Sequence, residues 1–472
     1  MGSIIETVSE IKLSAQDVEP LQEELAAYQA IYQPFFSRIE QKRQVQAYLQ
    51  GLMQPLPNKS IERIVLHNQG DDANAIRAMQ HFMSESTWSD EPILHHHWEE
   101  VDQELGVEDG VLITDSSGVP KQGEASAGVK RQWCGELGKV DNCQVGVYLG
   151  YASHLGYTLL DRRLYLPEEW VTEAAYAERR AKCGIPDQIT FKTQPELALE
   201  MIQAVAESGR LRFRWLTCDE AFGRDSDFLD GVSPYLCYLA EVPSDTSVWL
   251  ERPLTTIPAW SGTGRKPVRQ RLAAGQPAAQ SVATVIAAIP AEQWSRQTIQ
   301  EGSKGPLIAD FVAIRVFNVR HGLPGHQVWL ICRRDLFSGE TKYYLSNAPA
   351  NTPLTTFVRV SGLRWPIESC FEDGKQELGL GDYQLRSWLG WHHHMTLVIL
   401  AHFFLVKVQR RLQQKAPHLT LPQAILLLKA VLPQPKFDLQ TTLEIVNYYQ
   451  RRQAAARFSH RKRRLAQLKQ LE

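Results

Sequence analysis

The chain has few cysteines, no long apolar run free of charge, and no surplus of charge of either sign. Its seven cysteines form no CxxC pair, so we expect reduced thiols in the cytoplasm rather than disulfides or a zinc site. No stretch of about 18 apolar residues without charge is present, and residues 1–10 lack a basic segment followed by an apolar one. Neither a membrane span nor a secretory signal is therefore expected.

Nucleotide-binding motifs are also missing. The chain has no GxxxxGK[ST] loop and no GxGxxG after a predicted strand, so no nucleotide cofactor is expected. Neither a GxSxG elbow nor the sequence context of a catalytic cysteine is present. The net charge of −2 by itself argues against a nucleic-acid partner.

The distribution of charge changes that conclusion. Residues 405–472 hold 14 Lys or Arg against 3 Asp or Glu, a balance of +11, whereas residues 1–110 hold 7 against 19, a balance of −12. Such asymmetry is typical of a charged binding surface. We expect the densest basic patch to contact a phosphate backbone, and a solvated helical tail is the alternative. The residues proposed for this contact are Arg461, Lys462, Arg463 and Arg464.

The N-terminal hundred residues are predicted to be helical. Residues 21–48 carry apolar side chains at helical spacing. Residues 58–60 are predicted to start a short helix, and residues 70–72 to separate it from a second helix at 73–84. This pair could be a DNA-binding helix-turn-helix, but the acidic charge favours a packing role equally.

A different pattern begins at residue 110. The apolar run GVLITD ends on Asp115, two β-rich runs follow at 142–153 and 156–167, and RFRWLTCD ends on Asp219. A further strand is expected at 235–243, and helices are expected at 170–183 and 195–208. This order predicts an α/β protein with an RNase H-like mixed-sheet core, in which the two aspartates lie at strand ends.

A β-rich insertion interrupts this core. The runs ADFVAIRVF, HQVWLICRRDL and TKYYLSN predict three strands of an inserted sheet. Residues 262–280 are basic and rich in Gly and Ala, which predicts a loop. Four positive charges within seven residues of this loop suit a DNA backbone, and they are Arg265, Lys266, Arg269 and Arg271.

Helices resume at about residue 353, so N- and C-terminal helical regions flank the core. The predicted division is residues 1–105 (helical, possibly DNA-binding), 106–243 (first part of the core), 244–350 (β-rich insertion), 351–412 (second part of the core) and 413–472 (basic and helical).

A charged stripe is predicted in the segment SGLRWPIESCFEDGKQELGL. At about 100° per residue, Arg364, Glu368 and Lys375 project within roughly 40° of one another on a helix. A solvated face of ion pairs is the alternative. The two strand-end aspartates favour a functional interpretation, because two aspartates and a later glutamate form the set that phosphodiester chemistry needs.

That chemistry uses two divalent ions about 3.5–4 Å apart, clamped by hard oxygen ligands. One ion activates the attacking water or 3′-hydroxyl, and the other stabilises the leaving oxygen. We therefore expect Asp115, Asp219 and Glu368 to be catalytic metal ligands. Arg364 and Lys375 beside Glu368 would face DNA phosphates.

The segment resembles the Tyr-Arg-Glu-Lys signature of insertion-sequence transposases. Arg364, Glu368 and Lys375 match at the right spacing, and Ser361 stands where the signature has Tyr. In the family that Tyr contacts DNA near the cleaved end. TDSSGVPKQG and CDEAFG resemble the two aspartate motifs of one branch, with Glu220 unusual beside Asp219. The resemblance covers about residues 35–470.

The resemblance implies a DDE-type transposase that moves an element by Mg²⁺-dependent cut-and-paste chemistry, with Mn²⁺ able to substitute. It implies a homodimer acting on double-stranded DNA, both transposon ends and target, in the bacterial cytoplasm on the nucleoid. Two alternatives stay open. One is an RNase H-like nuclease that cuts without strand transfer, and the other is an inactive transposase-derived DNA-binding protein.

Several further residues have two interpretations each. Trp365 either stacks on a displaced base or, as we favour, packs in the core. Lys121 either meets phosphate or lies in a solvated loop. Three neighbouring histidines on a helix cannot all face one ion, so no metal role is expected for residues 95–97 or 392–394. The second of these clusters either lines a DNA channel or packs.

Overall fold

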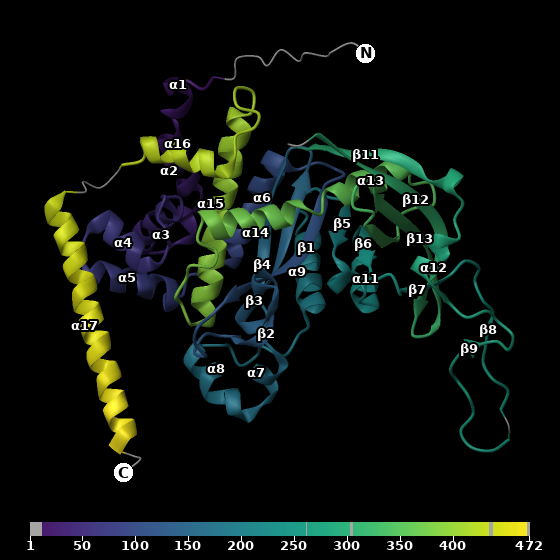
Figure 1. Cartoon of the computed structure of the whole chain (residues 1–472). Helices are drawn as coiled ribbons and strands as arrows, with labels where there is room; N and C mark the ends of the chain where they lie inside the picture. The colour runs from purple at the N-terminus through teal and green to yellow at the C-terminus, as the bar shows by residue number, and fades with distance from the viewer. Residues whose placement is uncertain (1–11, 261, 303–304, 434–437, 470–472) are drawn as a thin grey trace.

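The computed structural model describes residues 12–260, 262–302, 305–433 and 438–469. One large sheet runs through the middle of the molecule, with N-terminal helices at one end and a projecting loop at the other (Figure 1). The strands of this sheet are β1 (Val111–Pro120), β2 (Lys130–Cys134), β3 (Lys139–Ser153), β4 (Gly156–Leu164), β5 (Trp215–Cys218), β6 (Cys237–Val242), β7 (Ser247–Trp249), β10 (Gln280–Ser281), β11 (Ser295–Gly302), β12 (Gly305–Arg320), β13 (Leu323–Asp335) and β14 (Thr341–Ser346).

The sheet has the order β10-β7-β12-β13-β14-β6-β5-β1-β3-β2, with β4 on β3 and β11 on β12. β1 pairs in parallel with β5, and β5 in parallel with β6, whereas the other pairings are antiparallel. The core of the molecule is thus a mixed sheet. The strands expected at 110–115, 142–153, 156–167, 212–219 and 235–243 are all present, and β2 is an additional one.

Two details of the expected sheet are wrong. β1 continues five residues beyond Asp115, because residues 116–120 stay paired with β3, so Asp115 lies within a strand and not at its end. The strands of the insertion do not form a sheet of their own. β14 pairs with β6, so the inserted strands continue the core sheet edge to edge.

The insertion also contains a projecting loop. β8 (Thr255–Thr256) and β9 (Arg271–Leu272) form a separate two-stranded ribbon. This ribbon and the loop between its strands extend away from the body of the molecule (Figure 1). We call residues 250–280 the arm. The loop predicted for residues 262–280 is confirmed for the described residues, apart from β9 and the first residue of β10.

The N-terminal region is helical, as expected. Its helices are α1 (Ala15–Val18), α2 (Leu21–Tyr32), α3 (Ile39–Leu52), α4 (Ile61–Gln69), α5 (Ala73–Ser84) and α6 (Glu91–Leu105). Ser60 and Asp72 cap α4 and α5 through their side-chain oxygens. The predicted helix pair is therefore confirmed. Both helices pack their apolar faces into the core, and no DNA-reading role follows from that.

Short helices connect and cover the strands. They are α7 (Glu168–Thr172), α8 (Ala177–Cys183), α9 (Gln194–Ser208), α10 (Glu220–Gly223), α11 (Ser226–Val232), α12 (Val282–Ala287), α13 (Leu354–Gly362) and α14 (Pro366–Glu377), together with the 3₁₀ turns Gln33–Phe35, Gly135–Leu137, Ala174–Tyr176 and Ala291–Gln293. Glycines 184 and 209 end α8 and α9 in the left-handed region, where a residue without Cβ meets no steric cost.

The central helix is α15 (Trp388–Leu412), followed by α16 (Leu421–Val431) and α17 (Leu439–Lys469). α15 is long and apolar enough to cross a membrane, but 89% of its most apolar window is buried within the fold. It packs against β4 and against the N-terminal helices α3 and α5, so it is the core helix of the molecule. α17 lies along one side of the N-terminal helices (Figure 1) and is exposed over nearly its whole length.

Candidate active site

The parallel strands bring the two predicted aspartates to the same level of the sheet. The last paired residues of β1 and β5 are Thr114 and Cys218. Asp115 and Asp219 are the next residue on each strand, and Asp219 still has extended backbone angles. Because adjacent strands lie about 4.8 Å apart and in-register residues point to the same face, the two carboxylates lie side by side.

Local structure holds Asp219 in place. Its Oδ1 accepts hydrogen bonds from the backbone N–H groups of Ala221 (3.0 Å) and Phe222 (3.3 Å), so it caps α10. Gly223 lets this helix pack closely on β6, because a Cβ at that position would overlap the backbone oxygen of Glu241. A glycine at position 223 is therefore required by packing. Glu220, the neighbouring acid, is exposed.

The third predicted carboxylate, Glu368, lies on α14 together with Lys375. The single helical stripe that the sequence predicts is interrupted, because Arg364 precedes this helix. α13 ends at Gly362, residues 363–365 turn, and α14 starts at Pro366, where a missing N–H is tolerated. Arg364 therefore lies in the junction between two helices. It still reaches Glu368 in the first turn of α14, and its Nη2 lies 2.6 Å from Glu368 Oε1.

The Arg364 guanidinium joins carboxylates from three parts of the chain. Its Nη1 lies 3.6 Å from Asp115 Oδ2, and its Nε lies 3.8 Å from Glu241 Oε2. Asp115 and Glu368 are thus within the span of one guanidinium group. We call Asp115, Asp219, Glu241 and Glu368 the carboxylate cluster.

Glu241 was missed in the sequence. It lies on β6 directly after Ala240, which pairs with Cys218, so it stands in the same row as Asp115 and Asp219. The signal was available, because Glu241 is the one charge within the apolar run YLCYLAEVP. A buried charge is rare unless it is paired.

The site carries more negative charge than its single arginine balances. Burial above all, together with Asp219 and Glu368, raises the pKa of the Asp115 carboxyl to about 7, while Arg364 opposes the shift. Burial lowers the pKa of Arg364, but its four acidic neighbours outweigh burial and raise it. Nη1 of Arg364 is buried and has no hydrogen-bond partner among the described residues.

The donor set fits divalent cations in kind. Converging carboxylates are the hard oxygen ligands that Mg²⁺ and Mn²⁺ prefer, and an excess of negative charge favours binding of a cation. Among the described residues, no three His, Cys, Asp or Glu side chains form a ready-made metal site. The reason is visible in the geometry, since Arg364 lies between Asp115 and Glu368.

The predicted DNA contacts near the cluster fall into three cases. Trp365 was expected in the core, but its side chain is 63% exposed. Lys375 donates to the carbonyl of Gly118 (3.1 Å) and pairs with Glu136 (2.8 Å), so it ties α14 to β1. Lys121 folds inward onto the ring of Tyr383 and donates to its carbonyl.

The inward position of Lys121 does not fit the predicted phosphate contact. Its Nζ lies 3.4 Å from the ring centroid of Tyr383, and burial lowers its pKa to about 8. The solvated-loop alternative is therefore wrong for Lys121, and the phosphate contact stays a prediction.

The remaining predicted contacts are exposed and lie far apart on the surface. Arg265, Lys266, Arg269 and Arg271 are exposed on the arm, and Arg461, Lys462, Arg463 and Arg464 are exposed on α17. The N-terminal half of α17 pairs with the acidic helical region through Arg451 with Asp71 and Arg452 with Glu62. The four basic residues near its C-terminal end make no such pair among the described residues.

The second histidine cluster has a packing role. His393 stacks on Trp88 with ring centroids 3.5 Å apart, and His394 is bound by Tyr48 and the carbonyl of Gly379. All of residues 392–394 are buried in α15. Ser361, at the signature's Tyr position, is also buried, and its hydroxyl donates to the Val358 carbonyl.

Comparison with known proteins identifies the family. The family model of the DDE superfamily endonucleases matches residues 32–306, more than half of the chain, so the protein belongs to this family. The matched region contains Asp115 and Asp219 and ends before Glu368.

Two further similarities were found, and the first of them points the same way. The chain is 30% identical over 148 residues to a probable transposase for insertion sequence element IS701 from Microchaete diplosiphon. The match covers 31% of this chain and spans about a third, 35%, of that relative. A piggyBac transposase synaptic complex with hairpin DNA aligns over 92% of this chain and 77% of its own, with 9% identity and a TM-score of 0.38. At that score the likeness adds nothing to the fold.

Proposed function

We propose that the protein is a DNA transposase. It cleaves phosphodiester bonds at the ends of an insertion sequence and transfers the freed 3′-hydroxyl ends to target DNA by two-metal-ion catalysis. Asp115, Asp219 and Glu368 are the proposed metal ligands, with Mg²⁺ as the cofactor and Mn²⁺ able to replace it. The observation that carries the proposal is that Asp115 and a glutamate from a distant helix, Glu368, pair with one guanidinium group, while Asp219 follows the strand that pairs in parallel register with that of Asp115.

The strand arrangement supports an RNase H-like core. The order β4-β3-β1-β5-β6, with β3 antiparallel to β1 and with β1, β5 and β6 parallel, is the order expected for that fold. It places the first two acids on its two central strands. In the proposed core, β7 and β10 to β14 extend the sheet on the β6 side, and they separate Asp219 from Glu368 in sequence.

Each carboxylate has a definite part in holding the site. When two divalent ions are bound, they activate the attacking oxygen and stabilise the leaving one. Asp219 presents a carboxylate whose Oδ1 is fixed by two backbone donors. Asp115 is likewise held through Oδ1 by the N–H of Ser116 at 2.7 Å. Rigid ligands of this kind keep the reacting groups aligned.

The residues around Glu368 are suited to bind DNA. Arg364 and Lys375 place positive charge on either side of it, and exposed Trp365 offers a surface on which a displaced base can stack. The basic residues of the arm and of α17 would extend the phosphate contacts outward. We propose that the protein works as a homodimer on paired ends, on the bacterial nucleoid in the cytoplasm.

The test is a cleavage and joining assay with Mg²⁺. The substrate is a plasmid carrying the DNA that flanks the protein's own reading frame, and the products scored are excised ends and their insertion into a second plasmid. Wild-type protein should give both products. Glu368→Gln and Asp219→Asn should each lower both by at least about 10³-fold, since each removes a ligand worth several kcal/mol to the transition state.

Glu220→Gln is the matched control, because it neutralises an exposed acid next to Asp219 and should stay within a few-fold of wild type. Cleavage without joining would support the nuclease alternative. Binding of the flanking DNA with no Mg²⁺-dependent cleavage would support the transposase-derived DNA-binding protein. Equal activity of Glu368→Gln and wild type would refute the assignment of the third ligand.

A further inference from the structure

Arg364 lies among three acidic side chains of the carboxylate cluster. Its guanidinium pairs with Glu368, Asp115 and Glu241 at 2.6, 3.6 and 3.8 Å. The side chain is largely buried, and Nη1 makes no hydrogen bond among the described residues. The arginine therefore lies loosely among several carboxylates, and is not locked in a bidentate pair with one of them.

This position conflicts with metal binding. A guanidinium within ion-pair range of Asp115 and Glu368 occupies two of the three proposed ligands, and it would repel a divalent cation at close range. Divalent ions can bind both carboxylates only if the guanidinium moves away from them. A largely buried cation that moves needs another acidic partner, because an unpaired buried charge is costly.

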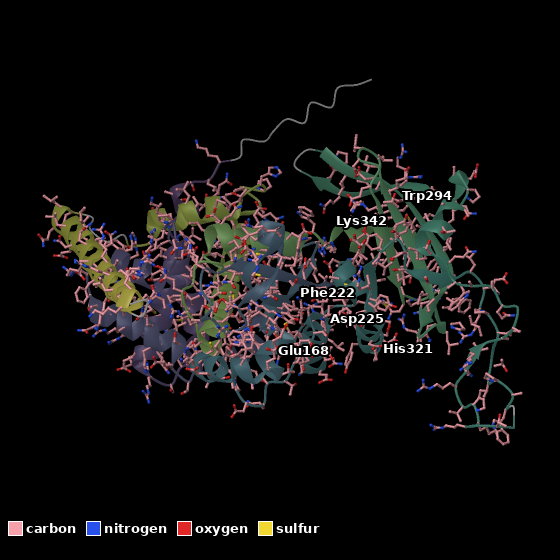
Figure 2. The ribbon with its side chains drawn as sticks, turned by 60° about the horizontal axis from the view of Figure 1, so that its bottom comes forward. Glu168, Phe222, Asp225, Trp294, His321 and Lys342 are labelled. Carbon is pink, nitrogen blue, oxygen red and sulfur yellow. The ribbon has the colours of Figure 1, made fainter. Side chains whose placement is uncertain are left out.

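Glu241 is placed to be that partner. It belongs to the carboxylate cluster but lies on the far strand of the row, one strand beyond Asp219. Its side chain is 8% exposed, and Lys342 on β14 lies 3.1 Å from its Oε1. Lys342 is labelled in Figure 2, in the half of the sheet that extends the core. Glu241 is thus oriented by the extended sheet, and it approaches Arg364 at Nε, a different nitrogen from the Nη2 that pairs with Glu368.

We propose, resting on the function proposed above, that Glu241 is a positioning residue that draws the Arg364 guanidinium away from Asp115 and Glu368 when divalent cations bind. In the metal-free protein Arg364 offsets part of the negative charge of the cluster. In the loaded protein Glu241 keeps Arg364 beside the site, where its charge faces the DNA phosphate. Glu241 acts through Arg364 and is not itself a ligand.

The experiment measures Mn²⁺ affinity of the full-length, DNA-free protein by electron paramagnetic resonance and calorimetry. Glu241→Gln should weaken Mn²⁺ binding about tenfold, because Arg364 then has no partner except the ligands. Arg364→Gln should strengthen binding. In the Arg364→Gln background, Glu241→Gln should have no further effect, which is the signature of action through the arginine.

Two control variants sharpen the test. Glu220→Gln removes an exposed acid and should leave Mn²⁺ affinity unchanged. Lys342→Met leaves Arg364 as the partner of Glu241 within the cluster, so it should raise the affinity about threefold. Lys342→Met also serves if Glu241→Gln does not fold, and an unchanged or lower affinity of Lys342→Met would count against the proposal.

Other results separate this inference from the proposed function. If Glu241→Gln weakens Mn²⁺ binding equally with and without Arg364, then Glu241 is a ligand and the positioning role is refuted. If Glu241→Gln binds Mn²⁺ like wild type, the role is refuted as well. If the wild type binds no Mn²⁺, or binds it as well as Asp219→Asn does, then the metal site itself is wrong and the proposed function fails with it.

Discussion

Two regions of this molecule are rich in side chains that can take part in catalysis. The charges and hydrogen bonds of these side chains are balanced to very different degrees in the two regions. In the carboxylate cluster, three of the four acids pair with Arg364, and one of its nitrogens has no hydrogen-bond partner among the described residues. In α15, three consecutive histidines are buried, and each has a hydrogen-bond partner. Both regions contain residue types that often take part in catalysis, so residue type alone does not distinguish them. They differ in how far their charges and hydrogen bonds are balanced.

His394 shows the satisfied case. Its Nε2 donates to the Gly379 carbonyl at 3.1 Å, and its Nδ1 accepts from the Tyr48 hydroxyl at 2.8 Å, so a neutral ring uses both nitrogens. Asp115 shows the other case, because it is buried beside another acid and its pKa is raised to about 7. Keeping such a residue lowers the stability of the fold. A role in a functional site would explain why the residue is kept despite this cost.

The largest expected effect is loss of stability in acid, driven by the buried histidines. Burial lowers the pKa of His97, His393 and His402 to about 4 and of His394 to about 3. The unfolded chain protonates these rings near pH 6.5 and the folded chain does not. Stability is thus fully present above about pH 6.5 and falls below it, by up to about 1.4 kcal/mol per pH unit for each ring.

Two carboxyls oppose this trend. The pKa of Asp115 is raised to about 7 and that of Asp373 to about 6, so both favour the folded state as the pH falls. The histidines outnumber them, so the midpoint of urea unfolding should decrease between pH 7 and pH 5. A midpoint that stays constant or rises over that range would show that the histidine cluster is not buried in its neutral form.

The next largest effect on stability is expected from replacing a single buried histidine. His394→Phe keeps a ring of similar shape but leaves the Tyr48 hydroxyl and the Gly379 carbonyl buried without a partner. We expect a loss of about 3 kcal/mol in the free energy of unfolding, measured by urea titration at pH 7.5. His95→Phe, a change outside the buried part of its helix, should lose less than about 0.5 kcal/mol.

A smaller effect of opposite sign is expected in the carboxylate cluster. Asp115→Asn removes a buried charge that the fold holds against repulsion, so it should increase the free energy of unfolding by about 1–3 kcal/mol at pH 8. The pKa of Asp115 is raised, so the gain should shrink as the pH falls from 7 and vanish near pH 4. Asp245→Asn, at an exposed position, is the control and should change the free energy of unfolding little at any pH. Equal destabilisation by both variants would contradict the expected difference between the carboxylate cluster and an exposed acid.

The smallest effect on stability is expected far from both regions. Replacing Arg461, Lys462, Arg463 and Arg464 by Ala removes charges with no ion-pair partner among the described residues. It should leave the free energy of unfolding within about 0.5 kcal/mol of wild type. If these residues contact phosphates, the slope of log affinity for duplex DNA against log salt should fall by up to about 4. An unchanged slope would show that α17 does not bind the DNA backbone.

Parts of the site could be predicted because their signals are local. Asp115 and Asp219 each follow a short apolar run, and Glu368 has the spacing of a known signature. Register could not be predicted, because the pairing of Thr114 with Cys218 and of Cys218 with Ala240 depends on contacts between distant segments. The charge of Glu241 within an apolar run was a signal in the sequence, but its position beside Asp115 and Asp219 appears only once β6 is aligned with β5.

Other errors also arise from tertiary packing. A repeat of charged residues predicted one continuous stripe, but the chain turns at residues 363–365 so that α13 and α14 can cover different strands. Trp365 was expected inside because tryptophan is mostly buried, and this turn leaves it outside. The inserted strands have clear β patterns, yet their fusion with the core rests on three residue pairs between β14 and β6.

The central position of α15 has a consequence for how the protein is made. The N-terminal helices cannot complete their core without this helix, because Tyr28 bonds to the Leu400 carbonyl and Tyr48 to His394, more than 300 residues later. A ribosome releases the N-terminal half first, so that half must wait, with apolar surface exposed, until residue 412 has emerged. The carboxylate cluster is likewise completed only after Glu368 has emerged, so a product truncated before that residue would hold Asp115, Asp219 and Glu241 without their fourth member.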